Sequence, residues 1–179
     1  MGLLKKFFKM NLFISSYIPL YILIFINEMG DLNVESVLEV YNKNNIFWVI
    51  IFAFSVVSII SMIIFFNFNH TKRNTFENVE SINNDILDYF ITYIIPLITV
   101  DITKNTSILV NLIIFIIIGI YYIESDLMYL NILLIFVGYK VYKDKSDNIV
   151  ISRKDKDYFK RNNNILCKKI GNTKIYIVK

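Results

Sequence analysis

The sequence predicts an α-helical integral membrane protein with four transmembrane helices, one short re-entrant or interfacial segment and a small basic β-rich tail. Hydrophobic residues make up 55% of the 179 residues, and the mean hydropathy of +0.51 is too high for an ordinary soluble domain of this length. The apolar residues are clustered in long runs. From Lys140 onward there are 12 Lys and Arg against 4 Asp and Glu. We therefore expect a membrane part, residues 1–143, and a cytoplasmic tail, residues 144–179.

Four apolar segments are predicted to span the membrane as helices. They are residues 11–26, 46–66, 108–123 and 127–143. The second is the clearest, because its 21 residues carry no charge and Trp48 lies in its first turn, where aromatic residues anchor at the membrane surface. Pro19, near the middle of the first, predicts a kink. The polar turn Glu124-Ser125-Asp126 joins the last two segments, which predicts a helical hairpin.

The path of a further apolar segment, residues 89–100, decides the topology. Twelve helical residues rise roughly 18 Å against a hydrocarbon core of roughly 30 Å, and Pro96 removes a helix hydrogen bond. With this segment crossing, five spans would put the basic tail opposite the basic N-terminus. With four spans, Lys43 is alone outside among the 19 Lys and Arg. Because positive charge favours the cytoplasmic side, we expect a re-entrant or interfacial segment and two cytoplasmic termini.

The candidate site residues form three groups. Carboxylates that flank an embedded segment can line an ion path or pair with a cation, or they simply mark where the segment meets water. Small residues on one helix face allow close packing, and exposed cations attract anionic lipid or a protein partner. The re-entrant group is Asp88, Tyr89, Thr92, Tyr93, Pro96 and Asp101. The helix-packing group is Ser55, Ser58 and Ser61, and the partner or lipid group is Arg153, Lys154, Lys168, Lys169 and Lys174.

The tail is predicted to form about three β-strands. The stretches 148–152, 165–170 and 173–178 are rich in β-branched and apolar residues, and Gly171-Asn172 predicts a type II′ hairpin turn between the last two. The basic tail could bind anionic lipid head groups, a cytoplasmic protein by strand pairing, or nucleic acid. Because few aromatic residues are interleaved with its cations, we do not expect sequence-specific binding of nucleic acid.

The sequence contains no catalytic or metal-binding motif. His70 is the only histidine and lies in a polar loop, whereas a metal site needs several ligands at suitable spacing. Cys167 is the only cysteine, which excludes an internal disulfide and fits a reducing compartment. Nucleotide-binding glycine patterns and zinc-protease motifs do not occur. We expect a protein that is not an enzyme and has no cofactor or metal.

The order of the motifs resembles one known family. A basic start precedes SYIPLYILIF, a polar loop leads to TYIIPLI, an apolar hairpin follows, and the tail ends in KIYIV. This order resembles the KwaA family, the membrane subunit of the bacterial Kiwa antiphage defence system. The resemblance implies a four-span inner-membrane protein that forms homo-oligomers. It also implies sensing of phage infection at the envelope together with a cytoplasmic DNA-binding partner of the KwaB type.

Two other classes of function stay open. A pore-forming or ion-conducting effector would use residues 89–100, between Asp88 and Asp101, as its pore element. A superinfection-exclusion or immunity protein would act as a passive membrane blocker. The neighbouring gene distinguishes them, because an adjacent soluble DNA-binding protein favours defence and a bacteriocin gene favours immunity.

Overall fold

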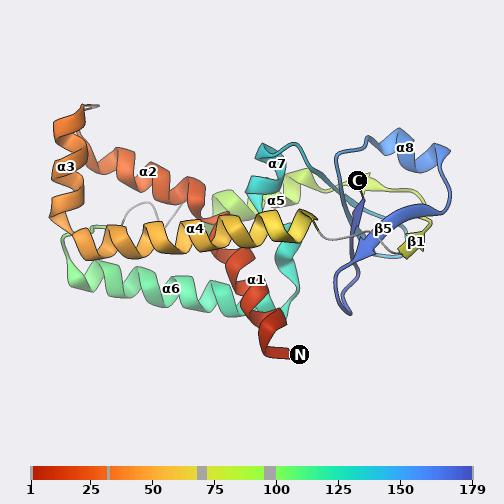
Figure 1. Cartoon of the computed structure of the whole chain (residues 1–179), viewed down its shortest axis with the longest axis horizontal. Helices are drawn as coiled ribbons and strands as arrows, with labels where there is room; N and C mark the ends of the chain where they lie inside the picture. The colour runs from red at the N-terminus through yellow and green to blue at the C-terminus, as the bar shows by residue number, and fades with distance from the viewer. Residues whose placement is uncertain (1, 32, 68–71, 95–99, 179) are drawn as a thin grey trace.

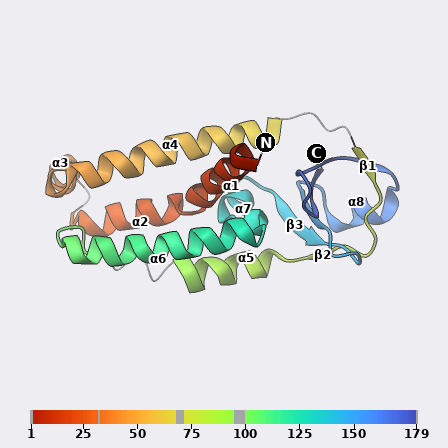
Figure 2. The ribbon, with the colours of Figure 1, turned by 90° about the horizontal axis from the view of Figure 1, so that it is seen from below.

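The chain folds into a layer of helices with a β-sheet at one end (Figure 1). A computed structural model describes residues 2–31, 33–67, 72–94 and 100–178. Both termini lie in the half of the molecule that carries the sheet, whereas helix α3 lies at the far end (Figures 1 and 2). The two ends are called the sheet end and the α3 end.

The first apolar segment forms two helices with a bend between them. Helix α1, Gly2–Ser16, ends just before Tyr17, and α2, Ile18–Glu28, begins just after it. Pro19 lies in the first turn of α2, where a missing N–H breaks no helix bond. The predicted kink is therefore confirmed. Helix α1 packs across α4, Asn45–Asn67, and α6, Asn105–Glu124, while α2 continues toward the α3 end (Figure 1).

Helix α3, Val34–Lys43, lies crosswise at the end of the helical layer (Figure 1). Asn33 caps it, since the Asn33 side chain accepts a hydrogen bond from Ser36 N at 2.7 Å. The apolar side chains of Val34, Leu38 and Tyr41 are exposed, and their spacing places them on one face. A short helix with an exposed apolar face is typical of a membrane surface.

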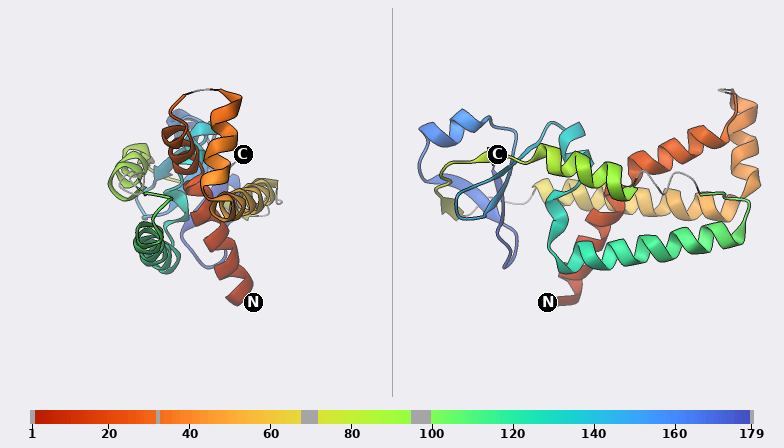
Figure 3. Two further views of the ribbon diagram at one scale, coloured as in Figure 1. Left: turned by 90° about the vertical axis from the view of Figure 1, so that its left-hand side faces the viewer. Right: turned by 180° about the vertical axis from the view of Figure 1, so that it is seen from behind.

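Residues 83–94 and 100–102 lie along the helical layer. Helix α5, Asn83–Tyr89, continues into the π-helical η1, Phe90–Ile94. The Asn83 side chain accepts a bond from Val141 N at 2.9 Å at the sheet end, whereas the Ile102 carbonyl accepts one from Asn44 Nδ2 at 3.1 Å at the α3 end. The two residues therefore lie at opposite ends. In the right-hand view of Figure 3, α5 and η1, drawn in yellow-green, begin near the sheet and extend toward the α3 end.

The re-entrant or interfacial segment predicted for residues 89–100 falls partly on residues 95–99, which lie outside the described residues. A re-entrant segment returns to the side from which it started, but here the described residues before and after it lie at opposite ends. Pro96 lies outside the described residues. The described residues 83–94 and 100–102 therefore lie along the layer, between its two ends.

The helical hairpin predicted over residues 108–143 is wrong in its second half. After α6 the chain forms the 3-10 turn η3, Leu127–Tyr129, the five-residue helix α7, Ile132–Phe136, and the strand β3, Lys140–Lys143. Five helical residues rise about 7.5 Å, far less than a membrane. Gly138, at φ +84°, takes a left-handed conformation that ends the helical run.

The sheet has six strands in the order β1-β5-β6-β4-β3-β2. All neighbours are antiparallel except the parallel pair β4 and β6. Besides β3, the strands are β1 (Lys72–Asn74), β2 (Glu80–Ser81), β4 (Ile149–Ser152), β5 (Ile165–Lys169) and β6 (Ile175–Val178). Helix α8, Lys156–Arg161, joins β4 to β5. The three predicted strands and the last hairpin are present, but residues 170–174 connect the hairpin, with Gly171 at φ +55°.

Both edge strands come from one segment between α4 and α5, residues 72–81, which we call the strap. Strand β1 pairs with β5 at one edge, and β2 pairs with β3 at the other. Between them, Phe76 and Val79 are buried against the sheet. The sheet therefore takes strands from both sides of the boundary predicted at residue 143.

The sheet separates two apolar cores. One face belongs to the core that runs through the helices, and the other is covered by the strap and by Phe159 of α8. The helix-facing residues are Val141, Ile149, Ile151, Ile175 and Ile177. The strap-facing residues include Tyr142, Val150, Cys167 and Val178. The sheet therefore packs against the end of the helical layer, in addition to its covalent connections with the helices.

Candidate functional site

The long helices are apolar on all sides and largely exposed. Three helical stretches of the described chain are long and apolar enough to cross a membrane: Lys6–Glu28, Asn45–Ile64 and Asn105–Glu124. In the most apolar windows of the last two, only 17% and 11% of residues are buried inside the structure. Soluble monomers rarely expose apolar surface of this extent. The helical layer therefore suits an apolar surrounding.

The predicted packing residues have different positions on α4. Ser58 is fully buried, and α1 is the element that packs most extensively on this helix. Ser55 and Ser61 are partly exposed. The hydroxyls of Ser58 and Ser55 donate to carbonyls of their own helix, Ser55 O at 3.0 Å and Ile51 O at 2.8 Å. Both hydroxyls therefore bond within α4, and the packing role of these serines stays a prediction.

A closer helix contact lies on α6, at a residue that the sequence analysis did not select. A Cβ atom built on Gly119 would lie 2.8 Å from Cε1 of Phe13 on α1. The Phe13 ring also lies 4.9 Å from the rings of Tyr17 and Phe115 and 5.2 Å from that of Tyr122. The only sequence signal was a glycine within an apolar run.

The re-entrant group divides between the core and the surface. Tyr89 is buried, with its ring 6.4 Å from that of Tyr122. Asp88 and Thr92 are exposed on α5 and η1, and Tyr93 lies within η1. Asp88 lies on the helix that starts at the sheet end, whereas Asp101 lies at the α3 end. The structure therefore does not bring the two carboxylates together as one site.

Asp101 organises the loop before α6. Its carboxylate accepts bonds from Thr103 Oγ1 at 2.6 Å and Thr103 N at 3.0 Å, and it pairs with Lys104 Nζ at 3.0 Å. These contacts indicate a structural role for the Asp101 carboxylate.

The predicted cations of the tail lie at separate places around the sheet. The Arg153 guanidinium lies 4.7 Å from the Tyr139 ring centroid, and Lys154 Nζ and Lys169 Nζ lie 5.5 and 5.6 Å from the rings of Tyr158 and Tyr176. Lys174 Nζ donates to Ser146 O at 3.3 Å. Lys168 is partly buried, and this burial lowers its pKa. Ring contacts fix several of these charges while leaving them at the surface.

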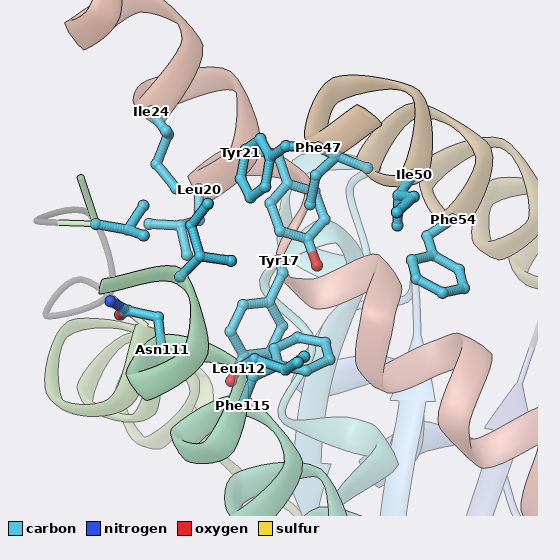
Figure 4. Close-up of a pocket in the computed structure, with 13 residues that line it drawn as sticks. Tyr17, Leu20, Tyr21, Ile24, Phe47, Ile50, Phe54, Asn111, Leu112 and Phe115 are labelled. Carbon is cyan, nitrogen blue, oxygen red and sulfur yellow. The ribbon is translucent and has the colours of Figure 1, made fainter. Parts of the chain in front are cut away.

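A cavity of about 240 Å³ lies between α2, α4 and α6 (Figure 4). Its walls are almost entirely aliphatic and aromatic. The lining residues are Tyr17, Leu20, Tyr21, Ile24, Phe47, Ile50, Ile51, Phe54, Val100, Ile108, Asn111, Leu112 and Phe115. The sequence analysis did not predict it, because it depends on how the three helices diverge. Among the described residues, no cluster of His, Cys, Asp and Glu could hold a metal ion.

Fold and surface together define a small helical protein with membrane-length apolar helices and a mixed β-sheet packed on one end. The family model described as anti-phage protein KwaA matches residues 8–177. The chain therefore belongs to the KwaA family of anti-phage proteins, as the motif order predicted. No curated protein and no solved structure matches the chain.

Proposed function

We propose that this anti-phage protein crosses the bacterial inner membrane four times, senses infection at the envelope and acts with a cytoplasmic DNA-binding partner through its sheet. The four crossings are α1 with α2, α4, a third between Asn83 at the sheet end and Ile102 at the α3 end, and α6. The observation that carries this proposal is the exposed apolar surface of α4 and α6. Helices of 20 residues rise about 30 Å, which matches the hydrocarbon core.

The distribution of charge supports a cytoplasmic sheet. Among the described Lys and Arg residues, only Lys43 and Lys104 lie at the α3 end, where they pair with Glu28 and Asp101. The other described cations lie on the first turns of α1, on the strap and on the rest of the sheet region. Positive charge is retained on the cytoplasmic side of inner-membrane proteins, so the sheet and both termini face the cytoplasm.

The connections between helices and sheet support a relay. Helix α4 leads into the strap, and the strap, which supplies both edge strands, leads into α5. Helix α6 leads through α7 into β3. A displacement of the helices would therefore reach the sheet through both of its edges. The test of the whole proposal is phage plating on cells that carry this gene with and without its neighbours.

Introduced cysteines test the topology. Cys167 itself is a poor reporter, because it is buried and burial raises the pKa of its thiol. In a Cys167→Ala background, Asn42→Cys on α3 and Lys156→Cys on α8 occupy exposed positions at opposite ends. A membrane-impermeant maleimide should label Asn42→Cys in intact spheroplasts and Lys156→Cys only after permeabilisation. The reverse pattern, or equal labelling of both before permeabilisation, contradicts the proposed topology.

Neutralising the tail cations tests the partner surface. Lys154→Gln, Lys168→Gln and Lys169→Gln together should weaken association with the cytoplasmic partner and reduce protection against phage. The weakening should be greater at low salt, because exposed charges are screened over about 10 Å at 0.1 M. The matched control removes three other exposed charges, with Lys145→Gln, Lys156→Gln and Lys160→Gln. Equal effects of the two triple variants would indicate that only net charge matters, and would contradict a specific partner surface at Lys154, Lys168 and Lys169.

A further inference from the structure

The bend between α1 and α2 leaves the helical layer unevenly filled. On the sheet side of the bend, α1 packs against both α4 and α6. On the α3 side, α2 takes its place but diverges from these two helices (Figure 1). Tyr17, at the bend, lines the inner end of the cavity that results. The cavity is therefore a consequence of the kink at Pro19, and it is confined to the half of the layer nearest α3.

The depth of the cavity matches one leaflet of a bilayer. Along α6 its lining runs from Ile108 to Phe115, and α6 begins at Asn105. From Ile108 to Phe115 the helix rises about 10 Å, and from the start of α6 to Phe115 about 15 Å, half of a hydrocarbon core of roughly 30 Å. A group that enters at the α3 end and reaches Tyr17 therefore stays within the acyl region of a single leaflet.

The lining selects hydrocarbon over a polar ligand. The polar side chains among the described lining residues are Tyr17, Tyr21 and Asn111, and Asn111 Nδ2 donates to Ser107 O of its own helix at 2.9 Å. The cavity is also continuous with exposed apolar surface, since its lining residues Ile50, Phe54 and Leu112 are about half exposed. An occupant can thus enter sideways from the lipid.

Charges at the α3 end indicate which head group belongs above the cavity. Lys43 and Lys104 are outnumbered there by the acids Glu28, Asp31, Glu35, Glu39 and Asp101. This excess of negative charge opposes an anionic lipid. A zwitterionic aminophospholipid is complementary, because its ammonium group would pair with the exposed acids of α3 and its phosphate with Lys104, whose side chain is 72% exposed beside its ion pair with Asp101.

We infer that an acyl chain of a zwitterionic aminophospholipid from the α3-end leaflet occupies this cavity and fills the space between α2, α4 and α6. The inference rests on the proposed membrane insertion. The experiment distinguishes this lipid from a second copy of the chain and from an empty cavity. The lipid would stabilise the diverged position of α2, so that its loss would allow the three helices to close.

The test uses the full chain in nanodiscs that contain equal amounts of phosphatidylethanolamine and phosphatidylglycerol. Native mass spectrometry should show wild-type protein that retains phosphatidylethanolamine in preference to phosphatidylglycerol. Leu112→Trp fills the cavity from a half-exposed position and should reduce retention about tenfold, equivalent to the burial of about two methylene groups. Leu109→Trp, on the same helix but outside the lining, should leave retention unchanged.

Three results would overturn the inference. They are equal retention by wild type and Leu112→Trp, a preference for phosphatidylglycerol, and efficient disulfide formation between copies that carry Leu112→Cys in a Cys167→Ala background, which would assign the cavity to a second copy. Extraction of wild-type protein from membranes by alkaline carbonate would instead contradict the insertion on which both proposals rest. Inserted protein without retained lipid would contradict this inference alone.

Discussion

Gly119→Leu is expected to prevent α1 and α6 from packing and to remove protection against phage. A Cβ at this position would already lie 2.8 Å from the Phe13 ring, and that ring is held among Tyr17, Phe115 and Tyr122. Phe13 is only 2% exposed, so the ring has no free space into which it can move. Overpacking typically costs about 1–3 kcal/mol, and a leucine here exceeds the space by a whole side chain.

Thermal unfolding in a mild detergent measures this effect. Gly119→Ala should lower the midpoint less than Gly119→Leu, and Ile120→Leu, at a position 60% exposed, should leave it unchanged. The double variant Phe13→Ala with Gly119→Leu should recover part of the loss, because the two residues share one space. If Gly119→Leu is as stable as wild type, or if Phe13→Ala gives no recovery, the contact between α1 and α6 is not tight.

The helical layer was largely predictable, because hydrophobic runs and one proline determine it. The charge-free run of α4 and the kink at Pro19 were both visible in the sequence. The wrong prediction of a membrane span over residues 127–143 has a physical reason. Apolar residues are required both for burial in lipid and for burial between a helical layer and a sheet, and hydropathy does not separate the two.

A polar residue in that run indicates which kind of burial applies. Asn131 is 1% exposed, and its Nδ2 donates to Leu12 O at 3.1 Å and Ser15 Oγ at 2.7 Å, while its Oδ1 accepts from Leu133 N. It thus begins α7 and fastens it to α1. Nothing in the spacing of the sequence specifies these partners, which are more than a hundred residues away.

The position of residues 89–100 could not be decided by counting charges. Moving one crossing from residues 127–143 to residues 83–102 keeps the total at four and transfers only Lys104 to the α3 end. The asymmetry in positive charge is therefore almost the same in both arrangements, so the count supports the number of crossings without identifying them. Hydrogen bonds place Asn83 and Ile102 at opposite ends of the layer, which supports the arrangement proposed above.

The sites that depend on distant contacts were the least predictable. The strap strands β1 and β2 have three and two residues, too few to give a periodic pattern. The cavity exists only because three helices diverge. The tail cations, by contrast, were selected from composition alone, since charge is visible in a sequence without any partner, and their contact role stays a prediction.

Phe76→Ala is expected to release the strap from the sheet while leaving the helices inserted. Phe76 is 2% exposed, and its ring lies 5.3 Å from that of Tyr176 and 6.2 Å from that of Phe159. Truncating a buried phenylalanine to alanine typically costs about 3–5 kcal/mol. This loss of stability affects the core between the strap and the sheet, which is separate from the core of the helical layer.

Cys167 reports this change directly, because it is the only cysteine of the chain and lies buried in the same strap-facing core. In detergent, maleimide should label Phe76→Ala much faster than wild type, whereas Glu77→Ala, at an exposed strap position, should match wild type. Membrane fractionation should be unchanged, but protection against phage should be lost, since the strap joins α4 and α5 to both edges of the sheet. Rapid labelling with full protection would show that the strap does not carry the signal. Slow labelling of Phe76→Ala would show that the strap is held by other contacts.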